Sequence, residues 1–284
     1  MPERARNTGA SVRQRLLNLA HARGQPMELL LTRYALERLL HRLSLSPHRE
    51  RFVLKGAMLL ATWFDEPHRA TRDVDLLGFG DPAHDALLGV FREIMAIAVD
   101  DGVRFEINGL RIEAIREEAR YGGSRLRTTA ALAGARIPVT VDIGFGDAVE
   151  PGILDIDLPV LLGMPSPHLR AYPPETVIAE KFHAMVALGR ANSRMKDYYD
   201  VWMLMSRFEL EPERLRQAIV ATFTRRATAV PSVVPDGLSD AFATDPGKQR
   251  QWNAFVRNLA GPVPAFGLIV SGLRQRLAGF LAQS

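Results

Sequence analysis

The chain has 284 residues, of which 47% are apolar and 24% are charged, an ordinary composition for a folded protein. It contains no cysteine, which excludes disulfides, thiolate metal ligands and a cysteine nucleophile. Its apolar runs are shorter than a membrane-spanning helix needs, and no apolar segment follows the charged N-terminus. We therefore expect a cytoplasmic protein with no membrane partner. The net charge of +4 permits nucleotide and RNA partners without requiring them.

The first half of the chain predicts a small mixed β-sheet flanked by helices. Apolar residues at helical spacing indicate two helices within residues 11–43, separated at Gly24-Gln25-Pro26. The run Phe52-Val53-Leu54 ends at Lys55-Gly56 and leads into helical composition up to Phe64, which is typical of strand, turn and helix. The next predicted elements are a strand at 73–78, a helix at 82–98, and strands at 104–107, 111–115, 124–131 and 137–145.

The second half is helical almost throughout. From Pro173 onward the apolar spacing predicts helices at 174–188, 196–207, 211–224, 248–259 and 265–281. We therefore expect an α+β protein with two domains. Residues 1–165 would hold the sheet and the N-terminal helices, and residues 166–284 would form a helical domain.

An acidic pair lies on the strand predicted at 73–78. The strand period of two puts Asp73 and Asp75 on one face and Val74 and Leu76 on the other. Carboxylates about 6 to 7 Å apart along one strand repel each other unless a cation lies between them. Hard divalent cations with oxygen ligands, such as Mg²⁺, fill that role.

A third carboxylate is available on the strand predicted at 137–145. Alternation there gives one face to Thr140 and Asp142, so Asp142 would complete a carboxylate trio if this strand neighbours the first. The alternative is that these acids are solvated residues on an open sheet face. The turn at Gly56 favours a functional site, because a helix that begins after glycine presents backbone N–H groups to an anion.

The helix predicted at 174–188 places Lys181 on the same stripe as apolar residues, facing inward. Either Lys181 contacts a phosphate as a point charge, or its side chain extends past the core to water. On the next predicted helix, Asp197 and Asp200 share the stripe that buries Val201 and Leu204. Helix capping could account for Asp197 but less easily for Asp200. His183 is better explained as a structural hydrogen-bonding residue than as a general base.

Basic residues gather in three further places. The loop 189–196, which ends at Lys196, could contact phosphate, or it could be an ordinary connection between helices. Two groups of arginines, one within residues 111–136 and one at 225–226, could contact an RNA backbone, although Glu113, Glu117 and Glu118 make a salt-bridged, solvated surface about as plausible for the first group. These side chains belong to Arg111, Arg116, Arg120, Arg125, Arg127, Arg136, Arg225 and Arg226.

Four segments in this order resemble one known family: Phe52–Ala57, Thr71–Asp75, Glu180-Lys181 and Lys196–Asp200. The chain resembles the AbiEii/AbiGii nucleotidyltransferase toxins of type IV toxin–antitoxin systems, which include the mycobacterial MenT toxins. The resemblance covers about residues 27–207, and its specificity lies in the ordered set rather than in any one segment. It implies a nucleotidyltransferase fold, in which the helical C-terminal region completes the active site.

By this resemblance Asp73, Asp75, Lys181 and Asp197 take the catalytic roles. We expect Asp73, Asp75 and Asp142 to bind Mg²⁺. The candidate nucleotide-binding residues are Lys55, Gly56, Ala57, Thr71, Arg72, Lys196 and Asp200.

The chain departs from the general nucleotidyltransferase signature after its glycine. That signature has Gly-Ser or Gly-Gly, whereas Gly56 is followed here by Ala57, which has no hydroxyl to contact phosphate. The spacer from this turn to Asp73 is also longer. Thr71, two residues before Asp73, is the hydroxyl that could replace the serine, and in some relatives the residue at this place becomes phosphorylated.

The leading hypothesis is a toxin-type nucleotidyltransferase that uses Mg²⁺ to move a nucleotide from a nucleoside triphosphate to RNA. By resemblance the acceptor is the 3′ end of tRNA, and the family implies a cognate antitoxin as a partner. A second hypothesis keeps the fold and makes a protein side chain the acceptor of a nucleotidyl or phosphoryl group. A third is a non-catalytic RNA-binding or antitoxin-like module.

Overall fold

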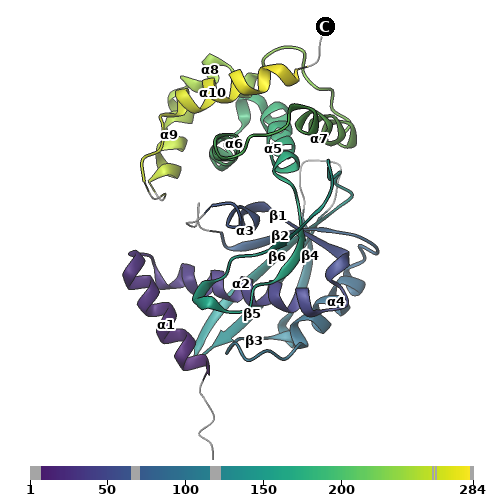
Figure 1. The fold of residues 1–284 in the computed structure, drawn as a ribbon, viewed down its shortest axis with the longest axis vertical. Helices are drawn as coiled ribbons and strands as arrows, with labels where there is room; N and C mark the ends of the chain where they lie inside the picture. The colour runs from purple at the N-terminus through teal and green to yellow at the C-terminus, as the bar shows by residue number, and fades with distance from the viewer. Residues whose placement is uncertain (1–7, 65–70, 116–122, 258, 260, 282–284) are drawn as a thin grey trace, which may run out of the picture. The chain divides into compact units, whose positions relative to one another are not determined.

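The structure is a computed structural model that describes residues 8–64, 71–115, 123–257, 259 and 261–281 (Figure 1). The chain forms two compact units. The first holds residues 1–146 and 154–171, and the second holds residues 147–153 and 172–284. In Figure 1 the first unit contains the sheet, coloured purple to teal, and the second contains the helices coloured green to yellow.

The first unit is built on an eight-stranded mixed sheet. The spatial order is β3-β5-β6-β2-β1-β8-β7, and β4 also pairs with β5. β2 pairs with β6 and β1 with β8 in parallel, while the other pairs are antiparallel. The strands are β1 (Phe52–Lys55), β2 (Asp73–Gly78), β3 (Arg104–Phe105), β4 (Arg111–Ile115), β5 (Gly123–Leu132), β6 (Ala135–Phe145), β7 (Leu154–Asp157) and β8 (His168–Ala171). The predicted mixed sheet is confirmed, and β7 and β8 were not expected from the sequence.

In the described part of this unit, four helices accompany the sheet: α1 (Thr8–Arg23), α2 (Met27–Leu45), α3 (Gly56–Leu60) and α4 (His84–Ala96). α2 packs against β6, β8 and α4, and Phe91 of α4 meets Phe52 of β1 edge to face at 5.4 Å between ring centroids. Val74, Val139, Val141 and Ile143 are buried on this helix-covered side, because strand alternation turns every second side chain toward it. The short helix α3 lies directly after β1, so the predicted strand, turn and helix are confirmed.

The second unit is helical in its described part. α5, α6 and α7 match the predicted helices to within one residue at each end, and α8 was not expected. The bounds are α5 (Pro174–Leu188), α6 (Met195–Arg207), α7 (Pro212–Arg225), α8 (Asp240–Ala243), α9 (Pro246–Val256) and α10 (Phe266–Leu277). Aromatic side chains from α6, α8, α9 and α10 pack together in its core, among them Tyr198, Phe242, Trp252 and Phe266.

The two units divide after β8, whereas the sequence placed the boundary before it, at 165/166. The reason is that β8 pairs with both β1 and β7, so its residues belong to the sheet. Short 3₁₀ turns lie at Arg49–Arg51, Ile107–Gly109, Leu161–Gly163, Gly189–Ala191, Asp236–Leu238 and Ala278–Phe280. Among the described residues, no helix combines the length and the hydropathy that crossing a bilayer requires.

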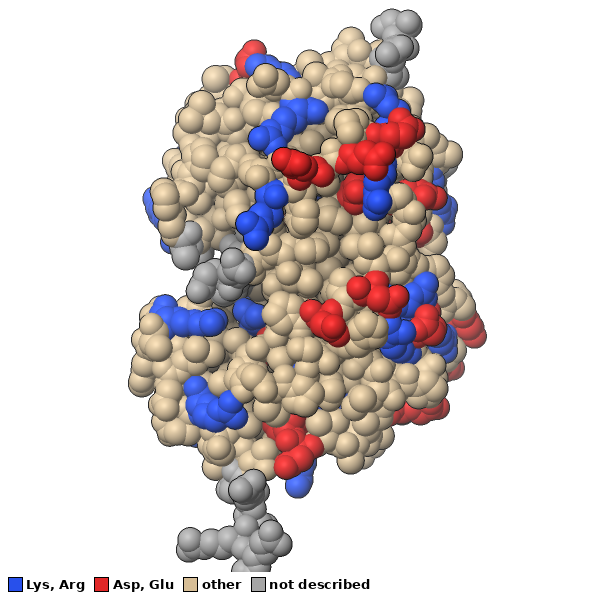
Figure 2. All heavy atoms as spheres, viewed as in Figure 1, with Lys and Arg blue, Asp and Glu red and all other residues tan. Residues whose placement is uncertain are grey.

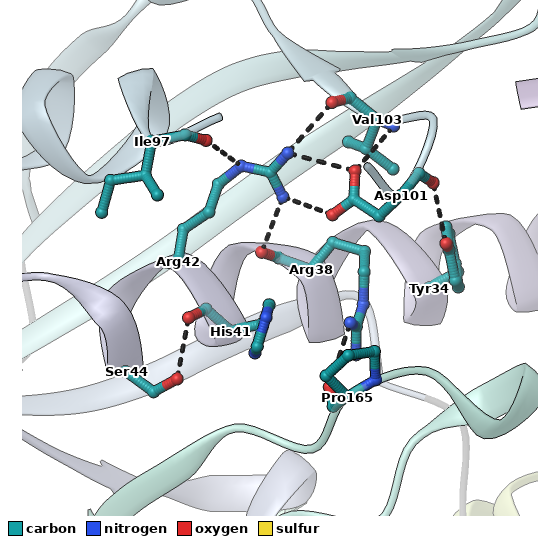
Figure 3. Close-up of polar contacts among 9 residues, drawn as sticks. All are labelled: Tyr34, Arg38, His41, Arg42, Ser44, Ile97, Asp101, Val103 and Pro165. Carbon is teal, nitrogen blue, oxygen red and sulfur yellow. Dashed lines mark hydrogen bonds and ion pairs between the residues drawn. The ribbon is translucent and has the colours of Figure 1, made fainter. Parts of the chain in front are cut away.

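A buried ion pair joins α2 to the segment after α4 (Figure 3). Arg42 donates through Nη1 to Asp101 Oδ2 at 2.6 Å and through Nη2 to Asp101 Oδ1 at 3.1 Å. The same guanidinium donates to the backbone oxygens of Ile97, Val103 and Arg38. The side chains of Arg42 and Asp101 are 3% and 0% exposed. Every nitrogen of Arg42 therefore has an acceptor, which is the condition under which a charge pair is tolerated in a core.

We predict that Arg42→Met lowers the free energy of unfolding by about 3 to 5 kcal/mol, because it leaves the buried carboxylate of Asp101 without its cation. Urea denaturation at pH 7 measures the loss. The matched control is Arg136→Met, which removes an arginine that is 70% exposed from its ion pair with Glu106. That variant should change stability by no more than about 0.5 kcal/mol. Equal losses for the two variants would contradict a special role for the buried pair.

Candidate functional site

The acidic pair of β2 lies on the side of the sheet opposite Val74 and Leu76. Asp73 and Asp75 are half-buried, whereas Val74 and Leu76 are 0% and 1% exposed. The predicted division of this strand into an apolar face and an acidic face is therefore confirmed. The two carboxylates share one face and reach solvent only in part.

Asp75 belongs to a row of four charged residues on four neighbouring strands. Its register partner on β6 is Asp142, and its register partner on β1 is Lys55. Arg125 of β5 is in turn the register partner of Asp142. Neighbouring strands lie about 4.8 Å apart, so two carboxylates stand side by side with a cationic residue at each end. The predicted adjacency of the strands that carry Asp75 and Asp142 is confirmed.

Arg125 holds both carboxylate oxygens of Asp142. Its Nε donates to Oδ1 at 2.7 Å and its Nη2 donates to Oδ2 at 2.6 Å. The hydrogen bonds to Asp142 are the main reason why the pKa of Arg125 is raised above its ordinary value. In the described part of the chain, no three His, Asp or Glu side chains gather as a metal-binding group. The trio of Asp73, Asp75 and Asp142 is thus not assembled as one set of ligands, and the metal roles of these residues stay predictions.

The turn at Gly56 lies against the carboxylate of Asp75. Gly56 has a φ of +69°, and a Cβ built on it would fall 1.9 Å from Asp75 Oδ2. Only glycine therefore fits here without displacing Asp75. The next residue, Ala57, is buried, and Lys55 is half-buried. Two of the predicted nucleotide-binding residues in this turn therefore lie next to Asp75. Lys55 is its register partner on β1, and the backbone of Gly56 approaches its carboxylate closely.

Thr71 contacts the other member of the acidic pair. Its Oγ1 donates to Asp73 Oδ1 at 2.8 Å, so the hydroxyl orients this carboxylate. Arg72, between them in sequence, is exposed. The contacts of Thr71 and Arg72 with phosphate, expected from the sequence, stay predictions.

In the helical unit, Lys181 of α5 lies between two aspartates of α6. Its Nζ donates to Asp197 Oδ1 at 2.7 Å and to Asp200 Oδ2 at 2.9 Å. Both aspartate side chains are 0% exposed, and the side chain of Lys181 is 13% exposed. The lysine therefore does not simply extend to water. The inward stripe predicted for all three residues is confirmed.

Arg194, at the start of α6, is a second cation at this cluster. Its Nε lies 2.6 Å from Asp197 Oδ2, and its side chain is 49% exposed. Burial by itself would raise the pKa of Asp197, but Lys181 and Arg194 outweigh burial and hold that pKa below its ordinary value. Asp197 thus remains a carboxylate, and its oxygens contact these cations rather than cap the helix. Lys196, which the structure places in the first turn of α6, is exposed.

The neighbours of Lys181 on α5 make structural contacts. Glu180 Oε1 lies 3.4 Å from the buried hydroxyl of Tyr172 and 3.3 Å from Arg226 Nη2. His183 accepts a hydrogen bond at Nδ1 from Arg226, at 3.3 Å, so its Nε2 carries the proton and donates to Thr228 Oγ1 at 3.0 Å. Burial, followed by the charge of Arg226, lowers the pKa of His183 to about 4. His183 is therefore a neutral hydrogen-bonding residue, as expected from the sequence.

Most of the described arginines proposed for RNA contact are ion-paired within their own unit. Arg125 pairs with Asp142, Arg127 with Glu113, Arg136 with Glu106, and Arg226 with Glu180. On the face drawn in Figure 2, most acidic side chains lie beside basic ones, and the basic side chains form no single patch. Arg116 and Arg120 lie outside the described residues. The salt-bridged surface is the better description of the four paired arginines.

Sequence reasoning did not find the partnership of Arg125 with Asp142 or that of Arg194 with Asp197. The first depends on the pairing of β5 with β6, which a single sequence does not display. The second had a usable signal, because Arg194 and Asp197 are three residues apart in a helix start, where i, i+3 pairs meet.

We predict that His183 makes the chain less stable in mild acid. Its pKa is lowered from 6.5 to about 4 on folding, so the unfolded chain binds the proton first and stability falls as the pH drops from about 6.5 toward 4. Between pH 7 and pH 5 the free energy of unfolding of the wild type should fall by about 1 to 2 kcal/mol more than that of His183→Gln. Urea denaturation at both pH values measures the difference. Equal slopes for the two proteins would show that His183 is not held neutral.

Comparison with known proteins places this geometry in a family. A family model described as nucleotidyl transferase AbiEii toxin, type IV TA system, matches residues 38–278. The crystal structure of JHP933 from Helicobacter pylori has a TM-score of 0.50 and 15% identity, covering 88% of this chain and 92% of that chain. A protein from H. pylori proposed to be a nucleotidyltransferase has a TM-score of 0.49 and 16% identity, covering 88% of this chain and 96% of that chain.

A search of curated protein sequences gives no match. The family model nevertheless spans well over half of the chain and includes β2, the Gly56 turn, α5 and α6, which carry the residues described above. The likeness to JHP933 shows that the two chains share a fold. The chain therefore belongs to the family of AbiEii nucleotidyl transferase toxins of type IV toxin–antitoxin systems.

Proposed function

We propose that the chain transfers a nucleotidyl group from a nucleoside triphosphate to the 3′ end of an RNA, with tRNA as the favoured acceptor. The observation that carries the proposal is the half-buried acidic pair Asp73 and Asp75, set against the Gly56 turn in a chain of this family. As a toxin of a toxin–antitoxin family, the chain acts in the cytoplasm and has an antitoxin partner in this proposal.

The residues around Asp75 fit a hard divalent cation. Asp73 and Asp75 provide oxygen ligands on one face of β2, and the backbone of Gly56 lies directly against the Asp75 carboxylate. Mg²⁺ would be held by these two aspartates, and when bound it supplies positive charge that offsets the charge of the triphosphate. Thr71 keeps Asp73 oriented through its hydroxyl. Lys55 adds a positive charge in register with Asp75.

In this proposal Lys181 takes the catalytic role that the resemblance to the family implies for it. A buried lysine between two carboxylates gives little stability, because desolvation offsets most of the Coulombic gain. Its position is therefore better explained by function, with Asp197 and Asp200 holding the ammonium group in place to contact phosphate. The lowered pKa of Asp197 makes it a weak proton acceptor at neutral pH. We assign it to positioning Lys181 rather than to general base catalysis.

In the proposed reaction the 3′ hydroxyl oxygen of the RNA bonds to the α-phosphorus of the triphosphate. The bond between that phosphorus and the bridging oxygen of the β-phosphate breaks, and pyrophosphate leaves with the electron pair of that bond. The hydroxyl proton passes to solvent. Ala57 supplies no hydroxyl, so backbone N–H groups and basic side chains carry the phosphate contacts in this proposal.

We predict that incubation of the full chain with tRNA, Mg²⁺ and each labelled triphosphate in turn labels the RNA. Asp75→Asn on the strand face and Asp197→Asn in the helical cluster should each lower the rate by at least about a hundredfold, because each removes charge organised around the phosphates. The matched control is Asp157→Asn, which changes an exposed aspartate at the sheet edge and should retain the wild-type rate. Thermal unfolding checks that the variants are folded.

The position of the label distinguishes the alternatives. Label that migrates with protein selects a protein-modifying transferase instead. No label on RNA or protein, together with no Mg²⁺-dependent triphosphate binding by calorimetry, selects the non-catalytic module. Equal activity of the wild type and Asp75→Asn would remove the acidic pair from the reaction.

We also predict that Gly56→Ala abolishes transfer, because the added Cβ must displace the Asp75 carboxylate. The control is Gly134→Ala in the β5–β6 turn, where φ is +84° and nothing lies within 4 Å of the added Cβ. Both variants should lose about 1 kcal/mol of stability from the positive φ, but only Gly56→Ala should lose activity. Urea denaturation and the labelling assay test this in parallel. Full activity of Gly56→Ala would mean that Asp75 tolerates displacement.

A further inference from the structure

The acidic face of the sheet contains three carboxylates and two cationic residues close together. Asp73 and Asp75 lie on β2, Asp142 lies beside Asp75 on β6, and Lys55 and Arg125 stand at the two ends of the row. Five such groups carry a net charge of −1. Without Arg125 the net charge would be −2, on the face that has to receive the still more negative triphosphate of the proposed function.

Arg125 forms a bidentate ion pair with Asp142, the geometry in which an arginine offsets the charge of a carboxylate most completely. The guanidinium donates from Nε and Nη2 to the two oxygens of Asp142, at 2.7 and 2.6 Å. The side chains are 34% and 17% exposed, so the pair is only partly screened by water. Asp142 is thereby turned toward β5, and its charge is offset by that strand.

We propose that Arg125 is a positioning residue that withholds Asp142 from the divalent cation, leaving Asp73 and Asp75 as the two protein ligands. The inference rests on the proposed function for the identity of the site, and it concerns how many carboxylates the cation meets. With two carboxylates the free protein binds the cation weakly, so the cation arrives together with the triphosphate whose charge it offsets. With a third carboxylate the free protein would hold the cation tightly, and the site would repel free triphosphate more strongly.

The test is Mn²⁺ binding to the full chain without nucleotide, followed by electron paramagnetic resonance of the free ion. Arg125→Met removes the guanidinium and frees Asp142, so we expect binding at least about tenfold tighter than in the wild type. Arg125→Met/Asp142→Asn removes one positive and one negative charge together. We expect this double variant to bind Mn²⁺ within about twofold of the wild type, because no ligand is lost.

The matched control is Arg127→Met, on the same strand two residues away. Arg127 forms an ion pair with Glu113 at 3.0 Å and is 55% exposed, so its removal lowers the net charge equally but frees no carboxylate of the row. We expect a change of no more than about threefold. Equal tightening by Arg125→Met and Arg127→Met would reduce the effect to overall charge and overturn the proposal. So would a loss of about tenfold or more in the double variant, because it would show that Asp142 is a ligand in the wild type.

Thermal unfolding of each variant checks that it is folded. If Arg125→Met alone is unstable, the double variant still tests whether Asp142 is a ligand in the wild type. Asp75→Asn should remove the tight binding created by Arg125→Met, which locates that binding at this row. Failure of this inference can be distinguished from failure of the proposed function. RNA labelling with no tightening in Arg125→Met overturns this inference alone, whereas tightening with no labelling of RNA overturns only the transfer reaction.

Discussion

The pairing of β2 with β6 is the constraint on which the acidic face of the sheet, and the chemistry proposed for it, depend. Because these strands are parallel and in register, the carboxylates of Asp75 and Asp142 stand side by side on one face of the sheet. The opposite face is buried under helices through Val74 and Val141, so neither strand can shift by one residue without exposing its apolar side chains. The hydrophobic core therefore fixes the acidic row, and the row in turn requires cations, which β1 and β5 supply as Lys55 and Arg125.

The helical unit handles buried charge differently. Asp197 and Asp200 are fully buried and share the ammonium group of Lys181, and Asp197 also contacts Arg194, so the cluster brings buried carboxylates together with two cations. Such an arrangement is a poor source of stability, since hydrophobic residues of similar volume usually do as well or better. The same unit has a well-packed aromatic core around Trp252 and Phe266, which contributes the stability that the charged cluster does not. Buried charge beside a sufficient core is consistent with the role proposed for this cluster.

Local patterns predicted much of this molecule. The alternation in Asp73–Gly78 set the acidic face, and the spacing of Lys181, Asp197 and Asp200 put all three on inward stripes, as found. The pairing of strands that are distant in the sequence could not be predicted from local patterns. β7 and β8 are four residues each, too short for periodicity to show, and they moved the boundary of the first unit to residue 171. The row from Lys55 to Arg125 is likewise visible only once four strands are in order, although every member was already noted as a charged residue.

The identity of the residue at the end of the row matters as much as its charge. A lysine at position 125 would bring one positive charge but would leave its three donors free to follow any nearby oxygen, including those of Asp75 or of a phosphate. The guanidinium of Arg125 is planar, and its two parallel N–H groups match the two oxygens of Asp142, so its charge is committed to that one carboxylate. In the proposed arrangement Arg125 neutralises Asp142, and Asp73 and Asp75 are the two acids assigned to the cation. Arginine at this position makes that arrangement a matter of geometry, which persists at salt concentrations that would screen a looser ion pair.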